Sequence, residues 1–149
     1  WHQVIKINDY QKNRFAQKII DHFGGDLTGK KIAILGWGFK ANTNDSRESP
    51  AIYVTEKLFK AGAILEIYDP MVSKESIFSD IDFYWESLKT KDLTTRISVL
   101  DSVNRLDLSY DATAILTEWE VFKSLDFSKT IVFDGRGVLS SSTYSIGKG

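Results

Sequence analysis

Apolar residues gather along this chain in short continuous runs, each closed by a glycine, a proline or an acidic residue. Continuous runs of this length are typical of strands that are buried on both faces, as in parallel sheets. Shorter apolar segments at 97–100 and 144–146 predict two minor strands. The four main strands are predicted at residues 31–36, 63–69, 112–117 and 130–134.

Helical signals occupy the segments between these runs. Ser49 and Pro50 are typical of a helix start, and Gly62 is typical of the stop, so a helix is predicted between the first two strands. Strand, helix and strand within so short a segment predict a right-handed βαβ unit. The fold class is therefore α/β: a Rossmann-like, doubly wound, mostly parallel sheet with flanking helices. Further helical segments are predicted at 73–81, 83–88, 101–106 (capped by Asp101) and 119–125.

The first part of the chain predicts one amphipathic helix over 4–23. Phe15, Ile19 and Phe23 recur at helical spacing, and the Gly24-Gly25 pair is typical of a left-handed stop. Residues 4–10 are apolar over a wide arc, which predicts self-association through this helix.

Composition excludes several classes of function. The chain has 149 residues, a length typical of one domain, and a net charge of −1. That charge, and the lack of a basic stripe with interleaved aromatics, argue against nucleic-acid binding. No apolar run approaches the roughly 18 residues that span a bilayer, and the first residues do not resemble a signal peptide. We therefore expect no membrane partner.

Residue counts narrow the chemistry further. The chain has no cysteine, which excludes disulfides, thiolate zinc sites and a cysteine nucleophile. Neither His2 nor His22 has a neighbouring ligand set, so no metal is expected. No Gly-x-Ser-x-Gly elbow indicates a hydrolase triad. The chain starts at Trp1 and its sole methionine is Met71, which indicates a processed start or a piece of a longer protein.

Ligands of open α/β sheets bind beyond the carboxyl ends of the strands. Three segments follow strands here: 36–49, 69–70 and 134–137. The first contains Gly36–Ala41, which formally satisfies G-x-G-x-x-G/A. The next helix, however, starts only at Ser49, so a pyrophosphate would not lie on its amide end.

Three interpretations of this segment stay open. It is a dinucleotide fingerprint, a turn that lets the strand exit tightly, or a loop that contacts an anion. We favour the third, because Lys40 and Arg47 supply cations in this segment and Arg136 supplies one after another strand. The structural alternatives are an Arg47–Glu48 pair and a surface role for Arg136.

The same segments resemble a known family. Residues 36–49 carry the G-x-x-F-K-x-x-T-x-D-x-R-E-S signature of the nucleotide-sugar dehydrogenases. Residues 61–63 and 67–70 resemble the same family, and residues 117–126 and 133–136 resemble later signatures of its UDP-glucose 6-dehydrogenase branch. Residues 4–15 are similar to the end of the central helix of that branch.

This resemblance implies a division into the end of a linker helix, 1–23, and a C-terminal UDP-sugar-binding domain, 24–149. It implies that Phe39, Lys40 and Arg136 contact UDP-glucose. It also implies that Arg47 reaches NAD, which is held mainly by an N-terminal domain absent from this chain.

The family oxidises UDP-glucose to UDP-glucuronate with two NAD, through a cysteine. The segment that bears the cysteine is absent here, so we expect no catalytic residue and an inactive fragment. The parent is expected to be a cytoplasmic homo-oligomer associated through the central helix. The alternatives are a related enzyme that uses a UDP-N-acetylhexosamine or GDP-mannose, a freestanding nucleotide-binding or interaction module, and a self-contained NAD enzyme.

Overall fold

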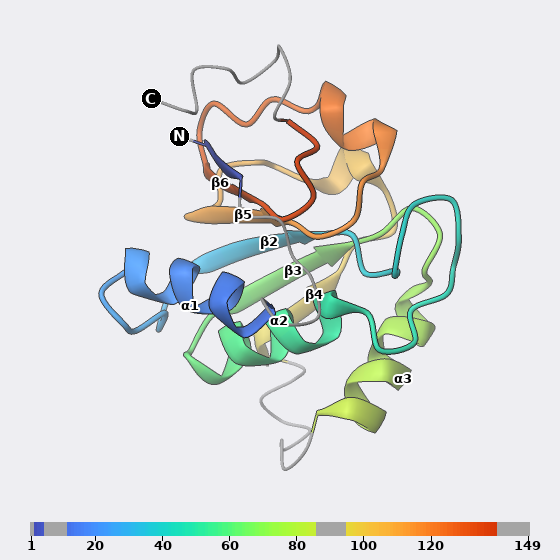
Figure 1. Ribbon diagram of the computed structural model, residues 1–149, viewed down its shortest axis with the longest axis horizontal. Helices are drawn as coiled ribbons and strands as arrows, with labels where there is room; N and C mark the ends of the chain where they lie inside the picture. Colours follow the sequence, from blue (N-terminus) through green and yellow to red (C-terminus); the bar gives the residue numbers. More distant parts are fainter. Residues whose placement is uncertain (1, 5–11, 86–94, 140–149) are drawn as a thin grey trace.

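The computed structural model describes residues 2–4, 12–85 and 95–139, and within them one parallel sheet organises the chain (Figure 1). The strand order is β1-β6-β5-β2-β3-β4, and every neighbouring pair is parallel. The predicted α/β, Rossmann-like class is thereby confirmed. The strands are β1 (His2–Val4), β2 (Lys31–Leu35), β3 (Ile64–Tyr68), β4 (Ile97–Val99), β5 (Ala112–Ile115) and β6 (Ile131–Asp134).

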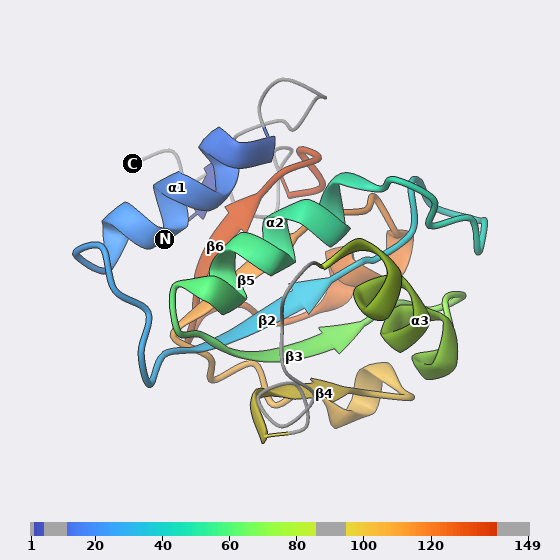
Figure 2. The same cartoon turned by 90° about the horizontal axis from the view of Figure 1, so that it is seen from below.

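Alternate residues of β2 enter two separate cores. Ile32 and Ile34 belong to the core beneath α1 (Lys12–His22), α2 (Pro50–Lys60) and α3 (Lys74–Tyr84), which cover one face of the sheet (Figure 2). Ala33 and Leu35 belong to the core on the other face. In the described part of the chain that second face carries the short 3-10 helices η1 (Val103–Arg105) and η2 (Glu120–Ser124). Burial on both faces explains why β2 is apolar throughout.

The predicted βαβ unit is confirmed. Ser49 caps α2, because its hydroxyl accepts the backbone N–H of Ala51 at 3.2 Å, and Pro50 is the first helical residue. The strands at β4, β5 and β6 and the helical turn at 119–125 are likewise found within a residue or two of the predicted bounds.

The helix predicted over 4–23 is wrong at its start. Val4 lies in β1, which extends the sheet beside β6, and the described part of the helix is α1, Lys12–His22. The buried ring of His2 lies 3.2 Å from a carboxylate oxygen of Asp134, so a tertiary contact helps to hold this segment on the sheet. Helical spacing holds from Lys12 onward, where Phe15 and Ile19 are buried.

Two smaller predictions are corrected. Ser102, not Asp101, caps η1, because its hydroxyl accepts the N–H of Asn104. The helix predicted over 73–81 continues through Phe83 to Tyr84, so no separate helix begins at Phe83.

Other predictions fall outside the described residues: the strand at 144–146, the segment 86–88, and the apolar face of 5–10 with its self-association. The boundary between 23 and 24 stays a prediction, although α1 and α2 share one core.

Strand order changes direction at β2. The chain passes from β2 to β3 on one side and returns to β5 on the other, so their carboxyl ends open at one edge of the sheet (right in Figure 1). In open α/β sheets this reversal is where ligands bind. No described helix is long and apolar enough to cross a membrane.

Candidate functional site

The loop at 36–49 leaves β2 through a tight turn at Gly36. Its φ is +100°, and a Cβ there would lie 2.7 Å from the backbone nitrogen of Thr117, which follows β5. A side chain is therefore excluded by both the backbone conformation and the close approach. Because α2 begins only at Pro50, its amide end does not start inside this turn. The geometry is that of a tight exit rather than of a dinucleotide fingerprint.

Asp69, which follows β3, anchors the first residues of the loop. One carboxylate oxygen accepts the backbone N–H groups of Trp37 at 2.7 Å and Gly38 at 3.0 Å. The other accepts those of Met71 at 2.8 Å and Val72 at 3.0 Å. The carboxylate is buried, and all four bonds go to backbone donors. This predicted strand-end acid thus organises the loop.

The next residues of the loop are held by residues that follow β5 and by the cap of α2. The carbonyl of Gly38 accepts the hydroxyl of Thr117 at 2.9 Å and that of Ser49 at 3.3 Å. The backbone N–H of Ala41 donates to Glu118 at 3.4 Å. The sequence indicated a family signature at 117–126 but no such role, because the bonds of Thr117 and Glu118 join residues almost 80 positions apart.

Arg136, which follows β6, closes over the same loop. Its Nε donates to the carbonyl of Leu116 at 3.1 Å, and its Nη2 donates to the carbonyl of Phe39 at 2.8 Å. Glu118 lies 3.6 Å from Nε, and the arginine side chain is 23% exposed. The alternative of a plain surface side chain is therefore wrong. The structure brings Arg136 directly to the segment of Phe39 and Lys40.

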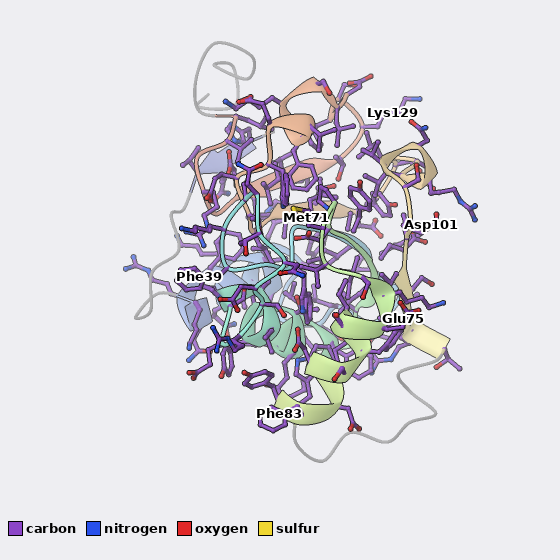
Figure 3. All side chains as sticks on the ribbon, turned by 90° about the vertical axis from the view of Figure 1, so that its right-hand side faces the viewer. Phe39, Met71, Glu75, Phe83, Asp101 and Lys129 are labelled. Carbon is purple, nitrogen blue, oxygen red and sulfur yellow. The ribbon has the colours of Figure 1, made fainter. Side chains whose placement is uncertain are left out.

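Phe39 and Lys40 extend from this pinned backbone. The Phe39 side chain is 49% exposed and lies on the carboxyl edge of the sheet (Figure 3). Lys40 is exposed, and no ion pair or hydrogen bond of its ammonium is found among the described residues. An apolar ring and a neighbouring unpaired cation on a fixed backbone suit a ligand that has both apolar and anionic parts.

Arg47 lies near the other end of the loop and pairs with Asp45, not with Glu48. Its Nε lies 3.2 Å from one carboxylate oxygen and its Nη2 lies 3.3 Å from the other. The guanidinium hydrogen bonds hold the pKa of the Asp45 carboxyl below its usual value. The Arg47 side chain is 85% exposed, so its pairing leaves it accessible to another molecule or domain.

A cleft of about 670 Å³ lies beside this loop, between 69–75, 99–101 and Arg105. Met71, Glu75 and Asp101 mark it in Figure 3. Phe39, Lys40 and Arg136 do not line it. Within the described ranges no group of three or more His, Asp or Glu side chains is arranged to hold a metal ion.

Comparison with known proteins identifies the family to which most of the chain is similar. Residues 33–141 match the family model described as "UDP-glucose/GDP-mannose dehydrogenase family, UDP binding domain". The chain is 40% identical to UDP-glucose 6-dehydrogenase 1 of Arabidopsis thaliana over 99% of its length, and 42% identical to UDP-glucose 6-dehydrogenase of Rattus norvegicus over 93%. It spans 36% and 30% of those relatives.

A solved structure agrees in fold. The UDP-glucose dehydrogenase of the archaeon Pyrobaculum islandicum superposes with a TM-score of 0.68 at 26% identity, over 89% of this chain and 28% of that one. The family match begins within β2 and runs past β6, and it therefore includes the loop at 36–49 and Arg136. The chain belongs to the UDP-glucose/GDP-mannose dehydrogenase family and carries its UDP-binding domain.

Proposed function

We propose that the loop at 36–49 and Arg136 bind UDP-glucose for an NAD-dependent oxidation to UDP-glucuronate. The observation that carries the proposal is the Arg136–Phe39 contact, which holds Phe39 and Lys40 outward at the reversal of strand order. The UDP-glucose 6-dehydrogenases at about 40% identity support this substrate.

Lys40 and Arg136 take different parts in binding. The Lys40 ammonium is a compact cation without a described partner, so it suits the diphosphate. Arg136 uses Nε and Nη2 on backbone carbonyls, which leaves Nη1 as the nitrogen that we assign to the substrate. Phe39 offers an apolar surface beside them. The arginine thus both shapes the loop and reaches the ligand.

Arg47 is the residue that we assign to NAD. Its exposed guanidinium suits a cofactor phosphate, which would replace or share the Asp45 carboxylate. NAD supplies the hydride acceptor for oxidation of the sugar alcohol. The cysteine of the family reaction is absent from this sequence, so the chain contributes binding and orientation rather than a nucleophile. We place the parent protein in the cytoplasm, as a homo-oligomer.

Calorimetric titration of this chain with UDP-glucose tests the substrate, with GDP-mannose and a UDP-N-acetylhexosamine as competitors. UDP-glucose is expected to bind in preference to both. Lys40→Ala should weaken binding about tenfold, the scale of one charge-assisted hydrogen bond. Lys129→Ala removes an exposed lysine away from the loop and should leave binding unchanged. No heat at millimolar UDP-glucose would contradict the proposal, and equal binding of GDP-mannose would contradict the choice of sugar nucleotide.

A further inference from the structure

One carboxylate oxygen of Asp80, on α3, holds both ends of the loop at 36–49. It accepts the indole N–H of Trp37 at 2.9 Å and the hydroxyl of Ser46 at 2.5 Å. Trp37 is the second residue of the loop and is fully buried, and Ser46 is also buried. Because both donors meet the same oxygen, the start of the loop and its later part are joined through a helix that contributes no other predicted site residue.

Trp37 and Ser46, the two residues bonded to Asp80, lie next to the two parts of the loop that carry the predicted site residues. Trp37 comes two residues before Phe39, and Ser46 comes directly before Arg47. The intervening residues form no helix or strand. Bonds to a carboxylate are stronger than bonds between neutral groups, so this acceptor restricts an otherwise irregular segment. Moving either end would displace Phe39 and Lys40 relative to Arg47.

We propose that Asp80 is a positioning residue that sets the relative placement of the substrate-facing and cofactor-facing parts of this loop. The inference rests on the proposed function for its kinetic consequence, but its structural part stands on the two bonds alone. Asp69, Thr117 and Arg136 each hold residues at the beginning of the loop. Asp80 joins that beginning to the segment of Arg47, alongside the backbone bond from the Phe39 N–H to the carbonyl of Asp45 at 2.8 Å.

Helix α3 supplies a matched control. Asp82 lies on the same helix, has the same side chain and is exposed, and no bond of its carboxylate is found in the described part of the chain. Asp80→Ala and Asp82→Ala therefore remove the same carboxylate from the same helix. Trp37→Phe and Ser46→Ala remove one donor each and leave Asp80 in place.

Hydrogen–deuterium exchange on this chain tests the structural part without any ligand. Asp80→Ala removes the shared acceptor and should raise amide exchange at least about fivefold across residues 37–48, while β5 and β6 keep the rates of the unsubstituted chain. Asp82→Ala should leave the loop unchanged. Trp37→Phe and Ser46→Ala should each produce part of the effect, which keeps the test available if Asp80→Ala does not fold. An unchanged loop in all three variants overturns the proposal.

Steady-state kinetics of the intact polypeptide that carries this domain test the functional part. In the Asp80→Ala variant, the displaced binding groups should raise KM for both UDP-glucose and NAD by about tenfold. Its kcat should stay within about twofold of the unsubstituted enzyme. A purely structural role would lower the amount of active enzyme and leave both KM values unchanged, which overturns the positioning role. If the unsubstituted chain fails to bind UDP-glucose, the proposed function fails. The hydrogen–deuterium exchange result still decides whether Asp80 holds the loop.

Discussion

The guanidinium of Arg136 donates to the backbone carbonyl of Phe39 across 97 positions of sequence, at 2.8 Å. The same side chain donates to the carbonyl of Leu116. Two loops that follow β5 and β6 are thus joined to the loop that follows β2. The contact makes Arg136 part of the framework of the site as well as a candidate ligand.

Replacing Arg136 by lysine should break this framework while it keeps the charge. One ammonium cannot reproduce the planar fork that reaches two carbonyls, so at least one partly buried acceptor loses its donor. We expect the free energy of unfolding to fall by about 2 kcal/mol, measured by urea denaturation. Arg105→Lys, at an exposed arginine, should change it by less than about 0.5 kcal/mol. Equal effects of the two substitutions would contradict the framework role.

A matched pair of glycines tests the turn after β2. Gly36 and Gly25 both have positive φ, at +100° and +95°, but only Gly36 lies against Thr117. Gly25→Ala should cost about 1 kcal/mol from backbone strain alone. Gly36→Ala should cost at least about 3 kcal/mol, because overpacking is added to that strain. Thermal and urea unfolding measure the free energy of unfolding of both variants. Similar losses of stability would show that the turn at Gly36 accommodates a Cβ by a small backbone shift.

Asp69→Asn tests the anchor of the loop. The amide of asparagine offers one acceptor oxygen, whereas the carboxylate serves two pairs of backbone N–H groups. One pair then faces an N–H₂ group inside the protein, and a loss of about 3 kcal/mol in unfolding free energy is expected. Asp101→Asn, at an exposed acid on the neighbouring cleft, provides the control. A stability equal to that of the parent chain would refute the anchoring role.

The Asp45–Arg47 pair predicts a pH effect. The arginine hydrogen bonds lower the pKa of Asp45 below 3.8 in the folded state. The stabilisation that the Asp45–Arg47 pair gives the folded state is therefore present above pH 3.8. It is lost as the pH falls through the lowered pKa that Asp45 has in the folded state. Arg47→Gln should raise the Asp45 pKa toward 3.8 in an NMR titration.

Asp126 serves as the internal reference for that titration. Hydrogen bonds from Ser128 lower its pKa, and these bonds do not involve Arg47. The Asp126 titration should therefore stay in place in Arg47→Gln. An unmoved Asp45 midpoint would mean that the pair does not form in solution, and a parallel shift of Asp126 would indicate a general change of the fold.

Much of the fold could be predicted from local sequence. Continuous apolar runs indicated β2, β3, β5 and β6, and Ser49-Pro50 indicated the start of α2. These signals are local because an uninterrupted run of apolar side chains, and a side chain that caps a free backbone N–H, each lie within a few residues of the chain. The same reasoning failed at Val4, which lies in an edge strand of the sheet and not in the predicted helix.

The candidate site divides in the same way. The sequence by itself determined the class of fold, the loop after β2, the cations at the strand ends and the family signature at 36–49. Only the tertiary structure decided that Arg136 grips the carbonyl of Phe39, that Arg47 pairs with Asp45, and that Asp80 joins both ends of the loop. The physical reason is range: periodicity and capping act within a few residues, whereas these hydrogen bonds depend on strand order and on the packing of α3.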